Sequence, residues 1–315
     1  MNRTRVLVCG TNYGRTYLDA IRLGAKSYCL AGILGRGSVR SEDIAREYRV
    51  PLYRNVEHLD THVDLACAAM GASGANVVLG LLRRRIHILC EHPQRQDCLK
   101  SALDVAASLN LCFHVNGHFA DFEAARIFIA HVQRESRIKP PSFFHVTATD
   151  RSLYAVLDII GRVFLTVTPF EFHLKGRSAQ FIIVEGIVAG VPATFHIQVG
   201  ADVSQLPDGS QCYLVDHRIA AGFPSGIITL LSMNGPVVWN ANLNSVKEPT
   251  KPLVAVLHPD SGLTIESLTL RRVAANLRAV EALNKNIHER VLPEEQEPRY
   301  LFELSRAWEC LGSSL

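Results

Sequence analysis

The stretch "VLVCGTNYGRTYLDAI", residues 6–21, joins a buried apolar run to a glycine-containing turn and a helical pattern. A dinucleotide-binding turn has the form G-x-G-x-x-G between a strand and a helix. Gly10 fits the first position, Asn12 and Arg15 occupy the other two, and Gly14 comes one residue early. Gly10 can still supply the tight turn and Gly14 a close helix approach, and Asn12 tolerates unusual backbone angles. We therefore expect this loop to bind the phosphates of a nucleotide cofactor.

Short apolar runs alternate with helical patterns through the residues that follow. The expected strands are 5–10, 29–35, 63–70, 86–93 and 111–119, and the expected helices are 14–25, 41–50, 75–85 and 98–110. Such alternation is typical of β-α-β units with right-handed crossovers and a parallel sheet. Ser41 is the expected cap of the second helix. The pattern predicts a Rossmann-type domain over residues 1–119.

After residue 120 the pattern changes to long runs in which apolar and polar residues alternate. The expected strands lie within 142–149, 170–176, 180–200, 212–222 and 226–243, and the expected helices are 121–136, 152–165, 264–288 and 299–311. Alternation of this kind is typical of an antiparallel sheet with one covered face. The fold class is therefore α/β, with a second α+β domain over residues 120–315 that carries a large, mostly antiparallel sheet for substrate binding and dimerisation.

Composition excludes several classes of function. Apolar residues make up 48% and charged residues 20% of the chain, and the net charge is +3, too small to predict a nucleic-acid partner. We interpret the run Arg83-Arg84-Arg85 as the solvated end of a helix. The eight cysteines are scattered without metal-ligand spacing, so neither a disulfide framework nor a metal site is expected. No signal peptide or membrane span is expected, and a cytoplasmic location follows.

The end of the second strand indicates which dinucleotide is bound. NAD-binding domains place an acidic residue here for the ribose 2'-hydroxyl, whereas "GRGSVRS" offers Arg36, Ser38, Arg40 and Ser41 instead. Guanidinium groups bind phosphate oxygens with two parallel hydrogen bonds. The sequence therefore favours NADPH as the cofactor, although these arginines could also be solvated loop charges.

A third group of polar residues, "CEHP" over residues 90–93, ends another buried strand. Catalytic groups in open α/β sheets lie at the carboxyl ends of the strands. Histidine side chains titrate near neutral pH, so His92 could pass a proton to a reacting atom beside a nicotinamide. Glu91 could orient His92 or face solvent, and position alone does not decide between a catalytic and a structural histidine.

A strand that ends in Glu-Lys-Pro is the signature of the glucose-fructose oxidoreductase and inositol dehydrogenase superfamily, and this chain has His92 in place of the lysine. Together with that substitution, four segments closely resemble the thiazolinyl imine reductases of siderophore biosynthesis. These segments are "NYGRTYL" (12–18), "GRGSVRSEDIAREYRVPLY" (35–53), "HVTATDRSLYAVLDII" (145–160) and "DHRIAAGFPSGIITLLSMNGPVVW" (216–239). The resemblance extends to about Leu243 and is weak beyond it.

The resemblance implies a reaction and its residues. Members of this family use NADPH to reduce the C=N bond of a thiazoline to a thiazolidine, on a yersiniabactin- or pyochelin-type intermediate tethered to a carrier domain of a nonribosomal peptide synthetase. Its proposed general acid falls on His92. Its cofactor-binding positions fall on Gly10, Thr11, Asn12, Arg36, Ser38 and Arg40, and we group the neighbouring Glu91 with them.

One position departs from the family pattern. The family has a tyrosine after the next strand as a second candidate proton donor, but Phe119 occupies that place here. His118, Asp121 or Tyr154 could replace it. We favour His92 as the donor, with His118 and Tyr154 as supporting residues.

Two alternatives remain open. A sugar or polyol dehydrogenase of the same superfamily is disfavoured by His92 and by the absence of the acid that binds NAD. A noncatalytic NADP-binding protein is conceivable because of Phe119. The expected partners are the carrier domain and a second copy of the chain, without nucleic acid or membrane.

Overall fold

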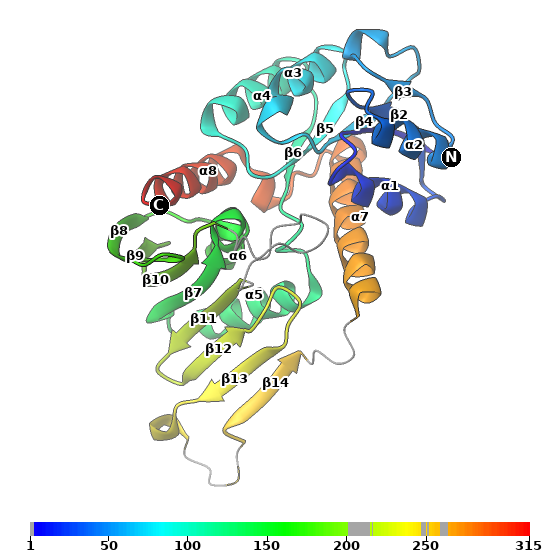
Figure 1. The fold of residues 1–315 in the computed structure, drawn as a ribbon. Helices are drawn as coiled ribbons and strands as arrows, with labels where there is room; N and C mark the ends of the chain where they lie inside the picture. Colours follow the sequence, from blue (N-terminus) through cyan, green and yellow to red (C-terminus); the bar gives the residue numbers. More distant parts are fainter. Residues whose placement is uncertain (1–2, 201–214, 216, 247–249, 251, 259–263) are drawn as a thin grey trace. The chain divides into compact units, whose positions relative to one another are not determined.

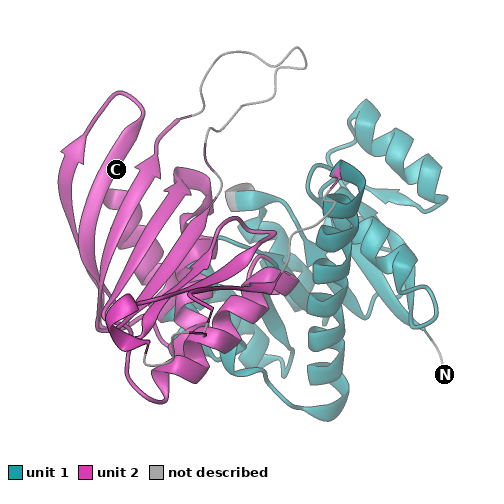
Figure 2. Cartoon of the chain, turned by 90° about the horizontal axis from the view of Figure 1, so that it is seen from below, with its two compact units in different colours: residues 1–118, 265–302 teal, residues 119–264, 303–315 magenta. Residues whose placement is uncertain are grey.

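The computed structural model describes residues 3–200, 215, 217–246, 250, 252–258 and 264–315. The chain forms two compact units, coloured separately in Figure 2. Unit 1 comprises residues 1–118 and 265–302, and unit 2 comprises residues 119–264 and 303–315. This division differs from the expected one mainly in residues 265–302, which return to the first unit because their long helix packs there.

Unit 1 is built on a parallel sheet of six strands in the order β3-β2-β1-β4-β5-β6 (Figure 1). The strands are β1 (Thr4–Cys9), β2 (Tyr28–Leu34), β3 (Leu52–Tyr53), β4 (Leu65–Ala68), β5 (His87–Glu91) and β6 (Phe113–Asn116). The order of the strands reverses between β1 and β4. In open α/β sheets such a switch point is where ligands bind, beside the carboxyl ends of the strands.

The helices of unit 1 cover both faces of this sheet. They are α1 (Gly14–Leu23), α2 (Val39–Tyr48), α3 (Ala75–Arg83), α4 (Gln96–Ser108) and α7 (Ile265–Glu289). Tyr17 and Leu18 of α1, Ile44 of α2, and Val280 and Leu283 of α7 share one buried core with the sheet. α3 and α4 pack against each other and against β5 and β6. Helix α7 is thus part of the Rossmann-type core, although it follows unit 2 in the sequence.

Unit 2 contains a mixed sheet of eight strands in the order β14-β13-β12-β11-β7-β10-β9-β8. The strands are β7 (Phe143–Thr149), β8 (Glu171–Arg177), β9 (Phe181–Val188), β10 (Val191–Gln198), β11 (Arg218–Phe223), β12 (Gly226–Leu230), β13 (Val237–Ala241) and β14 (Val254–His258). Every neighbouring pair is antiparallel except β7 with β10.

One face of this second sheet is covered by α5 (Glu123–Ser136) and α6 (Leu153–Phe164). The last helix is α8 (Pro298–Ser313), and short 3-10 helices lie at Val56–His58, Gly71–Gly74, Asp150–Ser152, Leu243–Ser245 and Glu294–Gln296.

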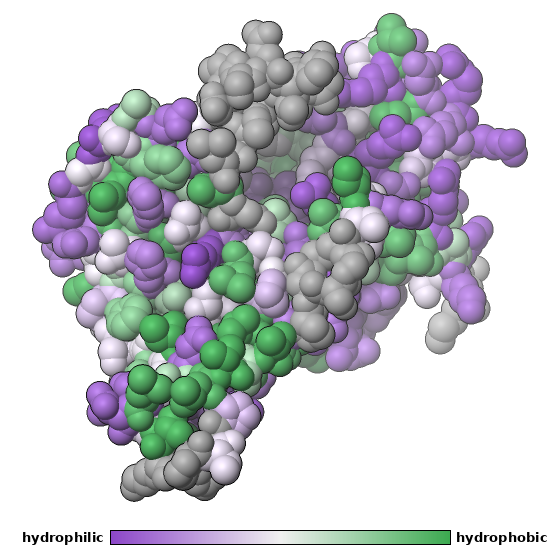
Figure 3. Space-filling view, turned by 60° about the horizontal axis from the view of Figure 1, so that its bottom comes forward, coloured by the Kyte–Doolittle hydropathy of each residue, from purple (hydrophilic) through white to green (hydrophobic). Residues whose placement is uncertain are grey.

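The register of the strands places a set of exposed apolar side chains on the face of this sheet opposite α5 and α6. They are Phe143, Ile183, Ile227, Val254 and Val256, and Figure 3 shows apolar side chains gathered in its lower part, where β13 and β14 lie.

The predicted fold class is confirmed by the two sheets. Strands β3, which has two residues, and β14 were not predicted from the sequence, and the β9–β10 hairpin was predicted as a single run. Ser41 as the cap of α2 is wrong, because the Ser38 side chain accepts a hydrogen bond from the Ser41 amide and the helix begins at Val39. Residues 212–214 and 216 of one expected strand lie outside the described residues. No helix in the described part of the chain is long and apolar enough to cross a bilayer.

Candidate active site

The loop between β1 and α1 has the backbone geometry that a phosphate site needs. Gly10 has φ +90°, and a Cβ at this residue would lie 2.4 Å from the Ala69 carbonyl oxygen, so only glycine fits. A Cβ added to Gly14 would lie 3.3 Å from the Val8 side chain, so α1 lies close to β1 at this residue. Thr11 is buried and Asn12 is exposed, and the first turn of α1 contains no acidic residue. These residues fit a pyrophosphate at the helix N-terminus.

The end of β2 leads into the exposed residues Arg36, Ser38 and Arg40. Arg54, which follows β3, is a fourth polar residue of this loop region. It was not predicted from the sequence, because only the pairing of β2 with β3 brings it close to the loop after β2. A Cβ on Gly37 would lie 2.6 Å from Arg54 Nε. Arg54 also pairs with Glu42 of α2 at 3.0 Å, which compensates the one acidic charge in the first turn of that helix. The loop therefore presents a cationic surface suited to a 2'-phosphate.

Glu91 and His92 lie at the end of β5, and Glu91 pairs in register with Asn116 of β6. The Nδ1 atom of His92 lies 2.6 Å from the Asn116 backbone oxygen and 3.1 Å from Glu91 Oε1. A carbonyl oxygen can only accept a hydrogen bond, so Nδ1 of His92 carries a proton. Any further proton on this ring is therefore held at Nε2. The peptide bond between His92 and Pro93 is cis.

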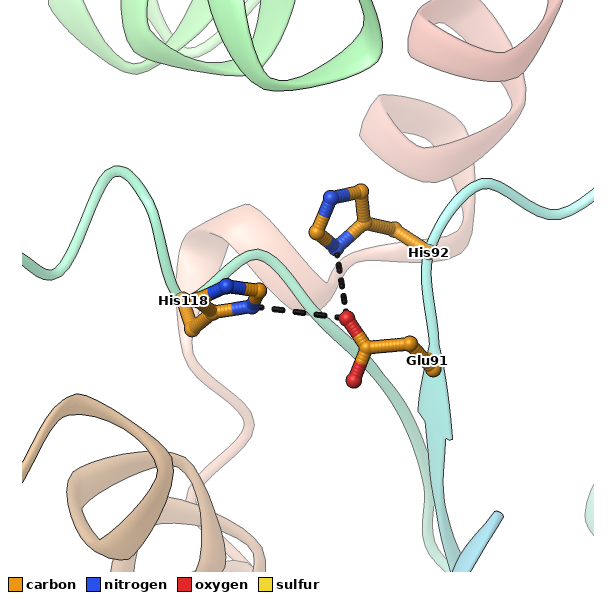
Figure 4. Close-up of side chains that lie close together, drawn as sticks. All are labelled: Glu91, His92 and His118. Atoms are coloured by element: carbon orange, nitrogen blue, oxygen red, sulfur yellow. Dashed lines mark ion pairs between the residues drawn. The ribbon is translucent and has the colours of Figure 1, made fainter. Parts of the chain in front are cut away.

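His118, in the segment that follows β6, also faces the Glu91 carboxylate. Its Nδ1 atom lies 3.4 Å from Glu91 Oε1, so one carboxylate oxygen faces both histidine rings (Figure 4). The two ring centroids are 5.2 Å apart. The other ring nitrogen of His118, Nε2, lies 2.8 Å from the hydroxyl of Tyr13 in the phosphate loop. The site thus connects the cofactor loop to the end of β5.

Three further polar residues complete the network around Glu91. Tyr17 of α1 donates to Glu91 Oε2 at 2.5 Å, and the Asn116 side chain donates to the Tyr17 hydroxyl. Asn276 of α7 accepts from Asn116 at 2.7 Å. None of Tyr13, Tyr17, Asn116 and Asn276 was predicted as a site residue from the sequence. A signal existed for the last of these, because Asn276 interrupts the apolar stripe of its helix.

The charge state of Glu91 follows from these contacts. Burial alone would raise the pKa of Glu91, but hydrogen bonds from His118 and His92, together with the positive charge that these rings carry when protonated, outweigh burial and lower the pKa to about 2. Burial and the Glu91 carboxylate raise the pKa of Tyr13 and of Tyr17 well above the usual value. At neutral pH the site therefore holds an ionised carboxylate surrounded by proton donors. Such a carboxylate favours a protonated imidazole beside it.

Glu91, His92 and His118 are also residue types that bind metal ions, and their polar atoms lie within 4.8 Å of one another. In this arrangement the Nδ1 atom of His92 carries a proton that it donates to the Asn116 carbonyl, so Nδ1 has no lone pair to offer a metal ion. We interpret the cluster as a site that holds and transfers a proton.

The remaining predicted residues lie in unit 2. Tyr154 is buried in α6 and packs edge-on against Trp308. Asp121 forms an ion pair with Arg162 at 2.8 Å, and Phe119 contacts Phe122 and His217. The structure brings Glu91, His92 and His118 together within unit 1, whereas Tyr154, Asp121 and Phe119 belong to unit 2.

Comparisons with known proteins agree with this architecture. Residues 4–117 match the family model "Oxidoreductase family, NAD-binding Rossmann fold", and residues 139–240 match "Thiazolinyl imine reductase Irp3-like, C-terminal". No curated protein sequence matches the chain significantly.

Three solved structures illustrate the similarity of fold. An oxidoreductase from Agrobacterium radiobacter in complex with NAD+, L-tartaric acid and magnesium has 12% identity and a TM-score of 0.75, over 99% of this chain and 96% of that one. The 3-ketoreductase KijD10 from Actinomadura kijaniata, in complex with NADP, has 14% identity and a TM-score of 0.72, over 99% and 98%. UDP-N-acetylglucosamine 3-dehydrogenase GnnA from Acidithiobacillus ferrooxidans has 15% identity and a TM-score of 0.70, over 100% and 98%.

The chain is therefore an oxidoreductase of the Gfo/Idh/MocA type, with a Rossmann-fold N-terminal domain and an Irp3-like C-terminal domain.

Proposed function

We propose that this protein uses NADPH to reduce the C=N bond of a thiazoline to a thiazolidine, on a siderophore intermediate tethered to a carrier domain of a nonribosomal peptide synthetase. The observation that carries the proposal is His92, whose Nδ1 proton is bound by Asn116 and faces the Glu91 carboxylate. The match of residues 139–240 to the C-terminal model of thiazolinyl imine reductases supports the substrate class.

The reaction adds a hydride to the imine carbon and a proton to the imine nitrogen. When bound, the nicotinamide supplies the hydride. His92 in its protonated form offers the proton at Nε2, while Glu91 stabilises the positive charge of the ring. Transfer of that proton leaves a neutral ring that keeps its Nδ1 proton, which the Asn116 carbonyl already accepts. The His92 ring therefore keeps its orientation and its Nδ1 hydrogen bond during the proton transfer.

A preference for NADPH over NADH is part of the proposal. Arg36, Ser38 and Arg40 offer donors at the end of β2, and Arg54 adds a guanidinium beside Gly37. These groups suit the charge of a 2'-phosphate.

The test is oxidation of NADPH by the purified protein with a synthetic hydroxyphenyl-thiazolinyl-thiazoline thioester, in parallel with NADH. Turnover that prefers NADPH supports the proposal. Oxidation of free sugars or polyols with NAD, and no reduction of the thioester, would favour a sugar dehydrogenase instead. Cofactor binding with no turnover of either the free or the carrier-bound thioester would favour a noncatalytic NADP-binding protein.

The carrier domain is the proposed partner for substrate delivery, and the Arg83–Arg85 run at the end of α3 is a candidate docking point. Arg84 and Arg85 donate to the backbone oxygens of Leu59 and Leu109. Charge reversal is therefore best made at the exposed Arg83. Unchanged turnover of the carrier-bound substrate in Arg83→Glu would exclude a docking role for this residue.

A homodimer through the open face of the unit 2 sheet is the second proposed partnership. The exposed side chains of Ile227, Val254 and Val256 support it, because a second copy would remove them from water.

A further inference from the structure

We propose that Asn276 is a positioning residue that acts through Tyr13 to hold His118 as a neutral ring with its proton on Nδ1. Of the two histidines, only His92 then takes up a second ring proton. The inference concerns the proton positions in the free protein, and it rests on the proposed function only where it predicts a pH–rate profile. Each step follows from the direction of a hydrogen bond.

The first direction is fixed by a backbone carbonyl. The side-chain amide nitrogen of Asn276, Nδ2, lies 2.8 Å from the Arg272 carbonyl oxygen, which can only accept. This settles which end of the amide is nitrogen, and the 2.7 Å bond from Asn116 to Asn276 Oδ1 agrees with it. The same nitrogen lies 3.2 Å from the Tyr13 hydroxyl oxygen. Tyr13 therefore accepts a hydrogen bond from Asn276.

The second direction concerns the phenol proton of Tyr13. Burial and the nearby Glu91 carboxylate raise the pKa of Tyr13, so the hydroxyl keeps its proton at neutral pH. Among the described residues, the hydroxyl contacts Asn276, which donates to it, and His118 Nε2 at 2.8 Å. The phenol proton is therefore donated to His118, and Nε2 of that ring is an acceptor.

The third step places the remaining protons. With Nε2 of His118 accepting, the ring proton is on Nδ1, which faces the ionised Glu91 at 3.4 Å. His118 is then neutral, and a second proton on it would meet the phenol proton of Tyr13. His92 has no such conflict, because its Nδ1 proton is directed to the Asn116 carbonyl. The positive charge that Glu91 favours is therefore taken up by His92.

Other titratable or charged groups face the cluster from each neighbouring element. Tyr17 of α1, Cys67 of β4 and Cys90 of β5 interact electrostatically with Glu91, and Arg272 of α7 interacts with Tyr13. Burial raises the pKa of both thiols and of Tyr17, so these three groups stay neutral at neutral pH. None of them changes its charge in the range where histidines titrate.

The test is NMR of ring nitrogens in the full-length protein labelled with ¹⁵N-histidine, followed between about pH 5 and 8, with His92→Gln and His118→Gln variants used for assignment. We expect His118 to stay neutral with its proton on Nδ1 throughout, while His92 titrates.

Asn276→Asp replaces the donor to Tyr13 with an acceptor, so the phenol proton turns to Asp and His118 becomes protonated. Tyr13→Phe removes the donor to Nε2 and should let His118 titrate. Tyr48→Phe is the matched control, because the Tyr48 hydroxyl bonds Asp19 away from the cluster.

Two results would overturn the inference: a wild-type His118 that carries its proton on Nε2, or a His118 that stays neutral and Nδ1-protonated in both Asn276→Asp and Tyr13→Phe. Tyr13→Phe decides the question if Asn276→Asp fails to fold. In the reductase assay we also expect kcat of Asn276→Asp to fall on the order of tenfold, with a second ionisation in its pH profile. Absence of thioester turnover would refute the proposed function and leave the NMR result intact.

Discussion

Replacing Glu91 by glutamine should remove about 3 kcal/mol of folding free energy at neutral pH. The pKa of this carboxyl falls from its usual 4.5 to about 2 in the folded protein. Each pKa unit corresponds to about 1.4 kcal/mol, which gives the figure above for the whole shift. Glutamine cannot replace this interaction, because its amide is uncharged and its single NH₂ group must face either Tyr17 or the two histidines, all of which are donors at this position.

The pH dependence has a definite sign. A lowered pKa stabilises the folded state fully above pH 4.5, and the contribution is lost as the pH falls towards 2. At pH 3 less than half of this contribution remains. Urea unfolding of wild type and Glu91→Gln at both pH values measures the difference. Glu47→Gln is the control, since its ion pair with Arg15 is exposed and should contribute less than about 1 kcal/mol. A difference between wild type and Glu91→Gln that is small at pH 7, or equal at both pH values, would refute the reasoning.

Four further predictions concern the cofactor loop, the proton donor, the phosphate pocket and the open sheet face. Gly10→Ala should abolish NADPH binding, measured by fluorescence titration, because its Cβ would clash with the Ala69 carbonyl; unchanged affinity would show that the loop does not hold the cofactor. His92→Ala should lower kcat by about 10²–10⁴-fold with little change in NADPH affinity, and undiminished turnover would assign the donor elsewhere. The double variant of Arg36 and Arg40 to alanine should raise KM for NADPH and leave KM for NADH unchanged; an equal effect on both would remove the 2'-phosphate role. Ile227→Lys should convert a dimer to a monomer in light scattering, whereas a wild-type monomer would contradict the proposed interface.

The Rossmann-type domain was predictable because each of its elements has a local signature. Apolar runs followed by helical periods extend over residues 5–119, and the parallel sheet follows from their alternation. Of the strands that were not predicted, β3 is only two residues long, and β14 is a five-residue run in which Val254 and Val256 are exposed.

The candidate site was predictable only in part. His92 and Glu91 end a recognisable strand, and His118 follows the next one, so their position at the carboxyl edge of the sheet could be inferred. Asn276 is 160 residues from Asn116 along the chain, and its contact depends on the packing of α7, which no local pattern specifies. Tyr13 is the last residue of the phosphate loop and Tyr17 is in α1, and the orientation of their hydroxyls could not be inferred from sequence.

The return of residues 265–302 to unit 1 has a consequence for protein engineering. A chimaera that exchanges everything after residue 119 with a relative would also exchange α7, and with it Asn276 and the helix that packs against α1. To transfer the substrate specificity of a relative, residues 120–264 should therefore be replaced as one segment, and the native α7 should be retained.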